Sequence, residues 1–277
     1  MGLSVYNNVE AQNAHRLLSN TGANLNKSME RLSSGLRINR AADDAAGLAV
    51  SEGMRSQIRG TNVASRNAQD GVSMVQVADG ALGNVGDMLQ RVRDLAVQAS
   101  NGTLTDAQRK NLDTEVQQIL TEIGKTGTAT EFNGLKILAG SVATAASAVT
   151  LQVGANASQN IAFTIGTVST SDLGISGLAV STAASATAAI ASLDAAISTV
   201  TTSRANLGAI QNRLEHTINR LGMTSENLQA AESRIRDADM ASEMIDYTRN
   251  QILQQSGTAM LAQANQAPQS ILQLLQG

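Results

Sequence analysis

The stretch LDAAISTVTTSRANLGAIQNRLEHTINRLGMTSENLQAAESRI, residues 193–235, decides the fold of this chain. Aliphatic side chains recur in it at every seventh residue, and a small or β-branched residue follows each of the first six at a spacing of three. This is the a/d seam of a coiled coil, and it predicts one unbroken helix over about 185–236. The seven-residue series consists of Leu193, Val200, Leu207, Leu214, Leu221, Leu228 and Ile235.

The first half of the chain carries a matching seam. Between Val75 and Ala99, apolar residues alternate at spacings of three and four, which predicts a helix over about 44–101 that stops at Asn101-Gly102. Thr105 then forms a capping box with Gln108, so a further helix is expected over about 105–128. Three helices with apolar seams pack together as a bundle.

The centre of the chain changes from helical to strand-like patterning. Asn133-Gly134 is a tight-turn signal, and the segments 149–153 and 161–165 alternate apolar with polar residues. A half-buried hairpin that lies on the bundle is therefore expected within about 132–170. The predicted fold class is mainly α, an elongated bundle of long helices or coiled coil with a small β-hairpin region.

Composition excludes several classes of function. The chain has 277 residues, a net charge of −3 and no cysteine, so nucleic-acid binding, disulfides and thiol chemistry are not expected. No run approaches the roughly 18 apolar residues of a membrane span, so no membrane partner is expected. The first 15 residues lack the basic and apolar regions of a secretory signal peptide, so export would need a route without a cleaved signal.

Residues that could carry catalysis are sparse. The chain contains no HExxH, GxSxG, GxxxxGK[ST] or GxGxxG motif, and its two histidines, His15 and His216, lie far apart in the sequence. Asp43-Asp44 with Glu52 can be imagined as a metal site, but carboxylates at the start of a helix are favoured by the helix dipole without any metal. No catalytic, cofactor-binding or metal-binding residues are predicted, and an enzyme is not expected.

The two ends of the chain are amphipathic and lie outside the predicted bundle. Methionines 240, 244 and 260 are read as core positions of helical seams. Ordering such segments costs about 1–2 kcal/mol of backbone entropy per residue, more than their pairing within one subunit returns. The hypothesis is that they are disordered in the monomer and fold when many copies bury them together. The residues expected to form this polymerisation interface are Leu18, Leu25, Leu32, Leu36, Leu261, Ile271, Leu272 and Leu275.

Three long motifs resemble those of bacterial flagellins. They are LSSGLRINRAADDAAGLAVSEGMRSQIRG (32–60), LQRVRDLAVQASNGT (89–103) and the run from NLGAIQNRLEHTINRL (206–221) to QILQQSGTAMLAQANQAPQSILQLL (251–275). The resemblance implies a structural subunit that self-assembles into the helical tube of a flagellar filament, the propeller of swimming motility. It also implies an inner α-helical polymerisation domain of residues 1–43 and 237–277, paired as a coiled coil, and an outer rod domain of residues 44–236. Large inserted outer domains have no room here.

The same resemblance implies partners and a location. The expected partners are further copies of the chain, a chaperone on the C-terminal segment, the filament cap and hook-junction proteins, and the flagellar export apparatus; the expected location is extracellular. The residues expected to be recognised by Toll-like receptor 5 are Arg91, Leu95 and Glu115. The alternative is that these residues have only a structural role and stabilise the bundle or a contact between subunits. A hook–filament junction protein with similar termini is the alternative, and self-polymerisation into long filaments distinguishes the two.

Overall fold

The structure is a computed structural model that describes residues 7–144 and 147–276, with side chains described up to residue 266. The described chain contains five helices and four short strands. It divides into two compact units, one formed by Met1–Ser56 and Asn227–Gly277 and the other by Gln57–Glu226. We call these the terminal unit and the central unit.

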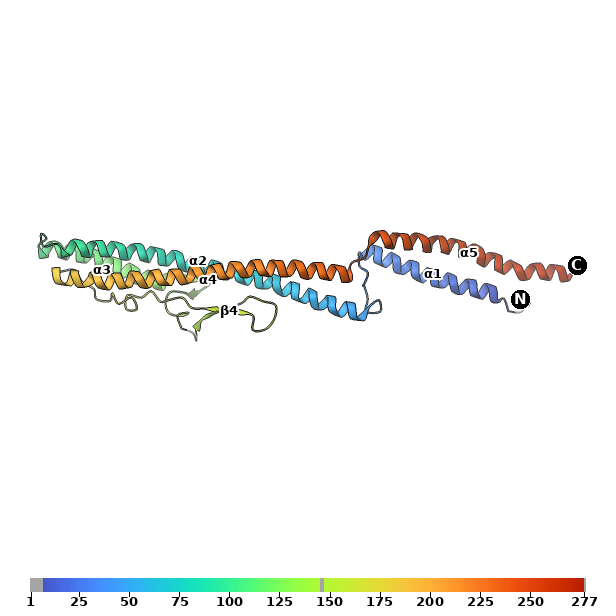
Figure 1. Ribbon diagram of the computed structural model, residues 1–277, viewed down its shortest axis with the longest axis horizontal. Helices are drawn as coiled ribbons and strands as arrows, with labels where there is room; N and C mark the ends of the chain where they lie inside the picture. Colours follow the sequence, from blue (N-terminus) through green and yellow to red (C-terminus); the bar gives the residue numbers. More distant parts are fainter. Residues whose placement is uncertain (1–6, 145–146, 277) are drawn as a thin grey trace. The chain divides into compact units, whose positions relative to one another are not determined.

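The central unit is built on the predicted heptad seams. Its helices are α3, Asp106–Ala129, and most of α2, Ala45–Ser100, and α4, Ala183–Arg236, which run side by side in Figure 1. Along α4, Leu193, Val200, Leu207, Leu214 and Leu221 are each no more than 3% exposed. The α2 seam from Val75 to Ala99 meets them in one continuous apolar core. The fold prediction of a mainly α chain with long helices is therefore confirmed.

The end of α2 is joined to the start of α3 by one buried arginine. Thr105 caps α3 with the predicted reciprocal bonds to Gln108. Arg109, 7% exposed, donates from Nε to the Ala99 carbonyl at 2.9 Å and from Nη2 to the Asn101 carbonyl at 3.0 Å. The guanidinium thus caps carbonyls at the C-terminal end of α2, which have no hydrogen-bond donor within the helix. Sequence reasoning identified the capping box but not this contact.

Two small hairpins lie in the segment that follows α3. Strands β1, Glu131–Phe132, and β2, Leu135–Lys136, are joined at Asn133 and Gly134, whose φ angles of 49° and 77° are those of the predicted tight turn. Strands β3, Val149–Gln152, and β4, Asn160–Phe163, pair antiparallel, with Val149 opposite Phe163. The inward side chains of β4, together with Val153, join the helical core, which confirms a half-buried hairpin packed on the bundle.

One helix differs from the expectation that no segment is apolar enough to cross a membrane. By length and composition alone α4 passes that criterion, with an 18-residue window of mean hydropathy 1.3. The core helix of a water-exposed bundle passes the same test, and α4 supplies Leu193, Val200 and Leu207 to such a core. The length and hydropathy of α4 are therefore only weak evidence for a membrane span.

The terminal unit pairs the two ends of the chain. Helices α1, Val9–Ser34, and α5, Met240–Gln276, lie side by side in Figure 1. Their contacts run in antiparallel order: Asn8 Nδ2 donates to the Ala264 carbonyl at 2.8 Å, Leu18 packs on Gly257, and Arg31 meets Glu243 at 3.5 Å. Gly35 ends α1 in the left-handed conformation, with φ 70°, and donates to the Arg31 carbonyl.

A short backbone ladder holds the two chain segments of the terminal unit where α1 ends and α5 begins. Leu36 and Asp237 form an isolated antiparallel bridge. The Arg37 amide donates to the Arg236 carbonyl at 2.7 Å, and the Ala238 amide donates to the Gly35 carbonyl at 3.0 Å. These bonds fix the register of α1 against α5, because they tie the residues directly after α1 to those directly before α5.

Candidate interaction surface of the terminal helices

The seam between α1 and α5 is a heptad seam on both helices. Half-buried or buried residues alternate at spacings of three and four along each. On α1 the large members are Leu18, Leu25 and Leu32. On α5 the seam is mostly polar or small, so the leucines of α1 meet few aliphatic side chains of equal size. The α5 members are Glu243, Tyr247, Asn250, Gln254, Gly257, Leu261 and Ala264.

This seam does not form a dry core. Ser28 is the one buried residue of α1, and Leu18, Leu25 and Leu32 are half-buried. In the central unit, by contrast, the equivalent heptad leucines Leu193 and Leu214 are fully buried, at 0% exposed. The terminal unit therefore leaves apolar surface in solvent that a helix pair of this length cannot cover alone.

Two large aliphatic side chains of α5 are exposed and lie outside its seam with α1. Ile252 is 63% exposed and Leu253 49% exposed, although each is as apolar as the seam residue Leu261. We call the exposed apolar residues of these two helices the terminal surface. Its described members are Val9, Leu17, Met29, Met240, Met244, Ile245, Ile252, Leu253 and Met260.

The structure corrects the interpretation of three methionines. Met240, Met244 and Met260 were expected at core positions of a seam, but they are 45%, 48% and 65% exposed. The physical reason is the choice of partner: α1 packs against the stripe of α5 that contains Gly257 and Leu261, where the small glycine allows close approach. The methionines lie outside this stripe and are not part of the buried core of the described chain.

The predicted interface residues whose side chains the structure describes fall in two groups. Leu18, Leu25, Leu32 and Leu261 lie half-buried in the α1–α5 seam, while Leu36 takes part in the bridge to Asp237. None of these is among the strongly exposed apolar residues, so sequence reasoning missed the outward members such as Ile252 and Leu253. The three remaining predictions, Ile271, Leu272 and Leu275, lie outside the residues whose side chains the structure describes.

The predicted receptor residues lie in the central unit. Arg91 Nη2 is 2.7 Å from Glu115 Oε1, and the two side chains are 58% and 42% exposed. Leu95 is only 2% exposed and belongs to the helical core. The exposed ion pair between α2 and α3 is thus available to a partner, and Leu95 supports the helix beneath it.

The acidic residues considered as a metal site form hydrogen bonds and ion pairs with other residues of the chain. Asp43 is 2.7 Å from Lys27 Nζ, and the hydrogen bond from Lys27, with that from the Arg40 amide, lowers its pKa to about 2. Asp44 accepts from the Gly47 amide at 2.9 Å at the start of α2. Glu52 accepts hydrogen bonds from Arg236 and Arg55, and these lower its pKa, the bond from Arg236 contributing most. Among the side chains that the structure describes, residues 7–144 and 147–266, no three His, Cys, Asp or Glu gather as a metal site requires.

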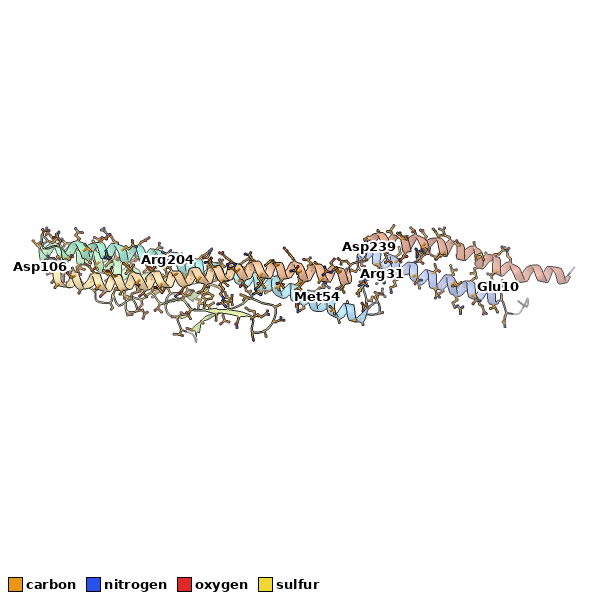
Figure 2. The ribbon with its side chains drawn as sticks, in the orientation of Figure 1. Glu10, Arg31, Met54, Asp106, Arg204 and Asp239 are labelled. Atoms are coloured by element: carbon orange, nitrogen blue, oxygen red, sulfur yellow. The ribbon has the colours of Figure 1, made fainter. Side chains whose placement is uncertain are left out.

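Charged groups also surround the end of α1. Arg31, labelled in Figure 2, lies where α1 approaches the start of α5 and pairs with Glu243. Glu30 Oε1 accepts from Arg40 Nε at 2.8 Å and from Asn39 Nδ2 at 2.7 Å. These contacts hold the segment between α1 and α2 on α1, and they organise the terminal unit rather than a reaction centre.

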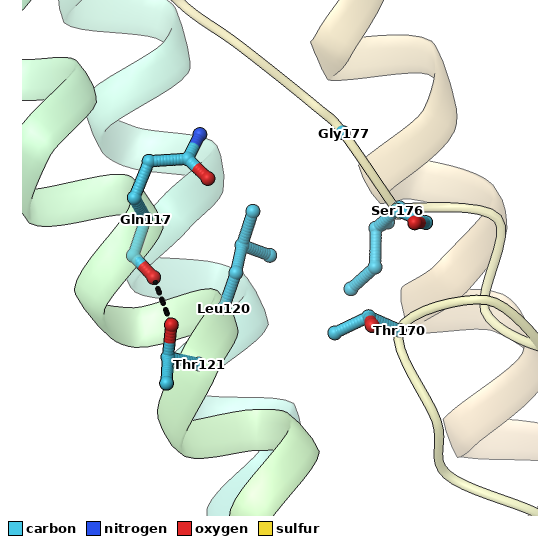
Figure 3. A pocket seen from close by; sticks show the side chains of 7 residues that line it. Gln117, Leu120, Thr121, Thr170, Ser176 and Gly177 are labelled. Atoms are coloured by element: carbon cyan, nitrogen blue, oxygen red, sulfur yellow. Dashed lines mark hydrogen bonds between the residues drawn. The ribbon is translucent and has the colours of Figure 1, made fainter.

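A shallow pocket lies in the central unit, between α3 and the segment that precedes α4 (Figure 3). Four of its lining side chains are polar, and the Thr121 hydroxyl donates to the Gln117 carbonyl at 2.8 Å. None of its lining residues has an ionisable side chain, so the pocket contains no candidate general acid or base. The lining residues are Gln117, Leu120, Thr121, Thr170, Ile175, Ser176 and Gly177.

Known proteins are similar to this chain in sequence and in fold. The chain is 50% identical to the flagellar filament 33 kDa core protein of Treponema phagedenis, over 98% of this chain and 99% of the relative. It is 51% identical to a flagellin of Halalkalibacterium halodurans, with the same coverage of both chains. A solved structure, a putative flagellar hook-associated protein from Vibrio parahaemolyticus, shares the fold with a TM-score of 0.60 at 14% identity, over 70% of this chain and all of that one.

Both halves of the chain match one family. Residues 5–143 match the N-terminal helical region of bacterial flagellin, and residues 190–275 match its C-terminal helical region. These regions comprise the helices of both the terminal and the central unit. The chain therefore belongs to the bacterial flagellin family and is a structural subunit of the flagellar filament.

Proposed function

We propose that the terminal surface, together with the leucine seam beside it, is where copies of this chain pack against one another in the filament. The observation that carries the proposal is the exposure of Ile252, Leu253 and Met260 on a helix pair that has no dry core. Burial of these side chains between subunits supplies the free energy of assembly, at about 25 cal/mol per Å² of apolar surface. A contact that does not close on itself gives an open helical polymer.

The same exposure supports the division of labour between the two units. The central unit has its own buried core, whereas the terminal unit completes its core only with neighbouring subunits. The inner polymerisation domain, residues 1–43 and 237–277, accordingly falls within the terminal unit, and the outer rod domain, residues 44–236, includes the whole central unit. In a dilute monomer α1 and α5 are then only marginally stable, because isolated helices depend on tertiary packing.

Membership of the flagellin family implies further partners. A chaperone covers the C-terminal helix before export, since Ile252 and Leu253 would otherwise drive early association. The subunit leaves the cell through the flagellar export apparatus, and the cap and hook-junction proteins contact its ends in the extracellular filament. No catalytic activity is assigned to the chain.

Arg91 and Glu115 form the surface proposed for Toll-like receptor 5. Their ion pair is exposed, so Arg91→Ala should change the unfolding free energy by about 1 kcal/mol or less. Receptor activation by the soluble subunit should nevertheless be lost. Full activation by a folded Arg91→Ala variant would contradict this assignment.

Seeded polymerisation tests the assembly surface. Purified full-length chain is mixed with short filament fragments, and growth is followed by light scattering and negative-stain electron microscopy. Ile252→Asp places a charge on the terminal surface, so the critical concentration should rise about a hundredfold or more. Val77→Asp is the matched control, because Val77 is an exposed apolar residue of the central unit, at 41%.

Three outcomes separate the alternatives. Normal growth of Val77→Asp with failure of Ile252→Asp places assembly on the terminal surface. Equal failure of both variants would contradict that placement. No growth of the wild-type chain on its own filament fragments would favour the hook–filament junction alternative.

A further inference from the structure

Four methionines stand out on the terminal surface. Met29, Met240, Met244 and Met260 are 54%, 45%, 48% and 65% exposed, whereas Met74 in the core of the central unit is 4% exposed. Methionine usually fills gaps in apolar cores, so its concentration on an exposed surface is unusual. The thioether sulfur is also the one group on this surface that mild oxidants attack.

We propose that these four methionines are an oxidation site that controls assembly of the free subunit. A peroxide is the oxidant: the sulfur lone pair attacks one peroxide oxygen, the O–O bond breaks, and that oxygen is transferred to sulfur. The second oxygen leaves as water, so sulfur loses two electrons and the peroxide gains them. The product is methionine sulfoxide, which sulfoxide reductases convert back to methionine.

The local environment gives the modification its effect. The exposed aliphatic residues of α5, Ile245, Ile252 and Leu253, have side chains that offer no hydrogen bond to a sulfoxide oxygen. A sulfoxide buried against such a surface loses its hydrogen bonds to water without replacement. Oxidation of the surface should therefore raise the critical concentration about tenfold or more, since a buried polar group without a partner is costly.

Exposure also determines when the site is sensitive. The inference rests on the proposed assembly surface: the four methionine residues are exposed in the free subunit and become covered in the filament. The switch consequently acts before assembly and leaves finished filaments intact. Met223, which is 59% exposed on α4 in the central unit, provides an internal reference for the reactivity of an uncovered methionine.

The test combines mass spectrometry with seeded growth of the full-length chain. Free subunit is treated with hydrogen peroxide, quenched, and digested to measure sulfoxide at each methionine. The same sample is added to filament fragments to measure the critical concentration. The matched variant carries Met29→Leu, Met240→Leu, Met244→Leu and Met260→Leu, which conserve volume and apolarity but remove the sulfur.

The expected result has three parts. The four sites oxidise far faster than Met74, growth of the treated wild type is suppressed, and peroxide does not change the critical concentration of the fourfold leucine variant relative to its own untreated sample. Incubation of the treated wild type with methionine sulfoxide reductases restores growth.

Two results would overturn the proposal. One is oxidised wild type that grows as well as untreated chain; the other is a fourfold leucine variant that peroxide inhibits as strongly as the wild type. Failure of the untreated wild type to grow would instead overturn the proposed assembly function, so the two failures are distinguishable.

Discussion

Leu18 of α1 packs directly on Gly257 of α5: a methyl group placed at Gly257 would lie 3.2 Å from Leu18 Cδ1. That spacing is tighter than ordinary van der Waals contact between carbon atoms. The two residues mark the middle of the antiparallel seam that pairs the ends of the chain. Glycine at this position brings the two helix backbones close together, at the expense of helix propensity.

The first prediction concerns this contact. Gly257→Leu should push α1 away from α5 and raise the critical concentration for filament growth, because the added side chain needs the volume that Leu18 occupies. Leu18→Ala in the same chain should recover part of the loss by vacating that volume. The measurement is seeded growth of the two single variants and the double variant. Strictly additive effects of the two substitutions would show that the residues do not meet in the assembled state.

A second prediction separates the two units. Leu214 is 0% exposed in the central core, so Leu214→Asp should lower the unfolding free energy by about 4 kcal/mol or more. Leu25, half-buried in the terminal seam, should tolerate aspartate without loss of the central unit, although filament growth should fail. Circular dichroism melting and seeded growth measure the two effects. The reverse pattern would exchange the roles of the units.

Two glycines of α3 give a third prediction. A Cβ at Gly127 would collide with the backbone carbonyl of Val168, whereas a Cβ at Gly124 meets nothing within 4 Å. Gly127→Ala should therefore destabilise the central unit by about 2 kcal/mol or more, since a backbone segment must move. Gly124→Ala should stabilise it by about 0.5–1 kcal/mol through helix propensity. Denaturant unfolding of both variants provides the comparison, and equal effects would contradict the packing of α3 on the 165–168 segment.

The fourth prediction is the titration of Asp43. Its pKa is lowered to about 2, first by the hydrogen bond from Lys27, so the charged form is favoured in the folded state. This contribution to stability is present above the unfolded pKa of about 4 and is lost as the pH falls through about 2. Lys27→Gln should raise the pKa of Asp43 toward its ordinary value. Carbon-detected NMR of the carboxyl group measures it, and an unchanged pKa in the variant would remove Lys27 as the cause.

Much of the central unit was predictable because its seams are local patterns. The heptad from Leu193 to Leu221 specifies which face of α4 is buried, and the matching seam of α2 has nowhere else to pack. The turn at Asn133-Gly134 and the capping box at Thr105 are equally local, since each depends on a few neighbouring residues. Arg109 was not predicted, because its acceptors at Ala99 and Asn101 are backbone carbonyls that leave no trace in side-chain pattern.

The candidate surface was harder to predict. The periodicity of α5 indicates that it has apolar residues on several faces but does not say which face meets α1. The sequence pattern indicates the seam leucines as interface residues and does not indicate Ile252 and Leu253. It also predicts core positions for Met240, Met244 and Met260, which the structure leaves exposed. The deciding contact is the approach of Leu18 to Gly257, a pair separated by most of the chain.

The sequence by itself thus determined the helices, the hairpins and the family, because helical period, turn chemistry and long motifs are all readable from neighbouring residues. Only the tertiary structure decided how the ends of the chain pair and which apolar side chains they leave in solvent. The physical reason is that amphipathicity specifies a buried stripe but not its partner. Here the partner is chosen by shape, through a glycine that admits Leu18 and leaves the larger aliphatic and methionine side chains of α5 facing outward.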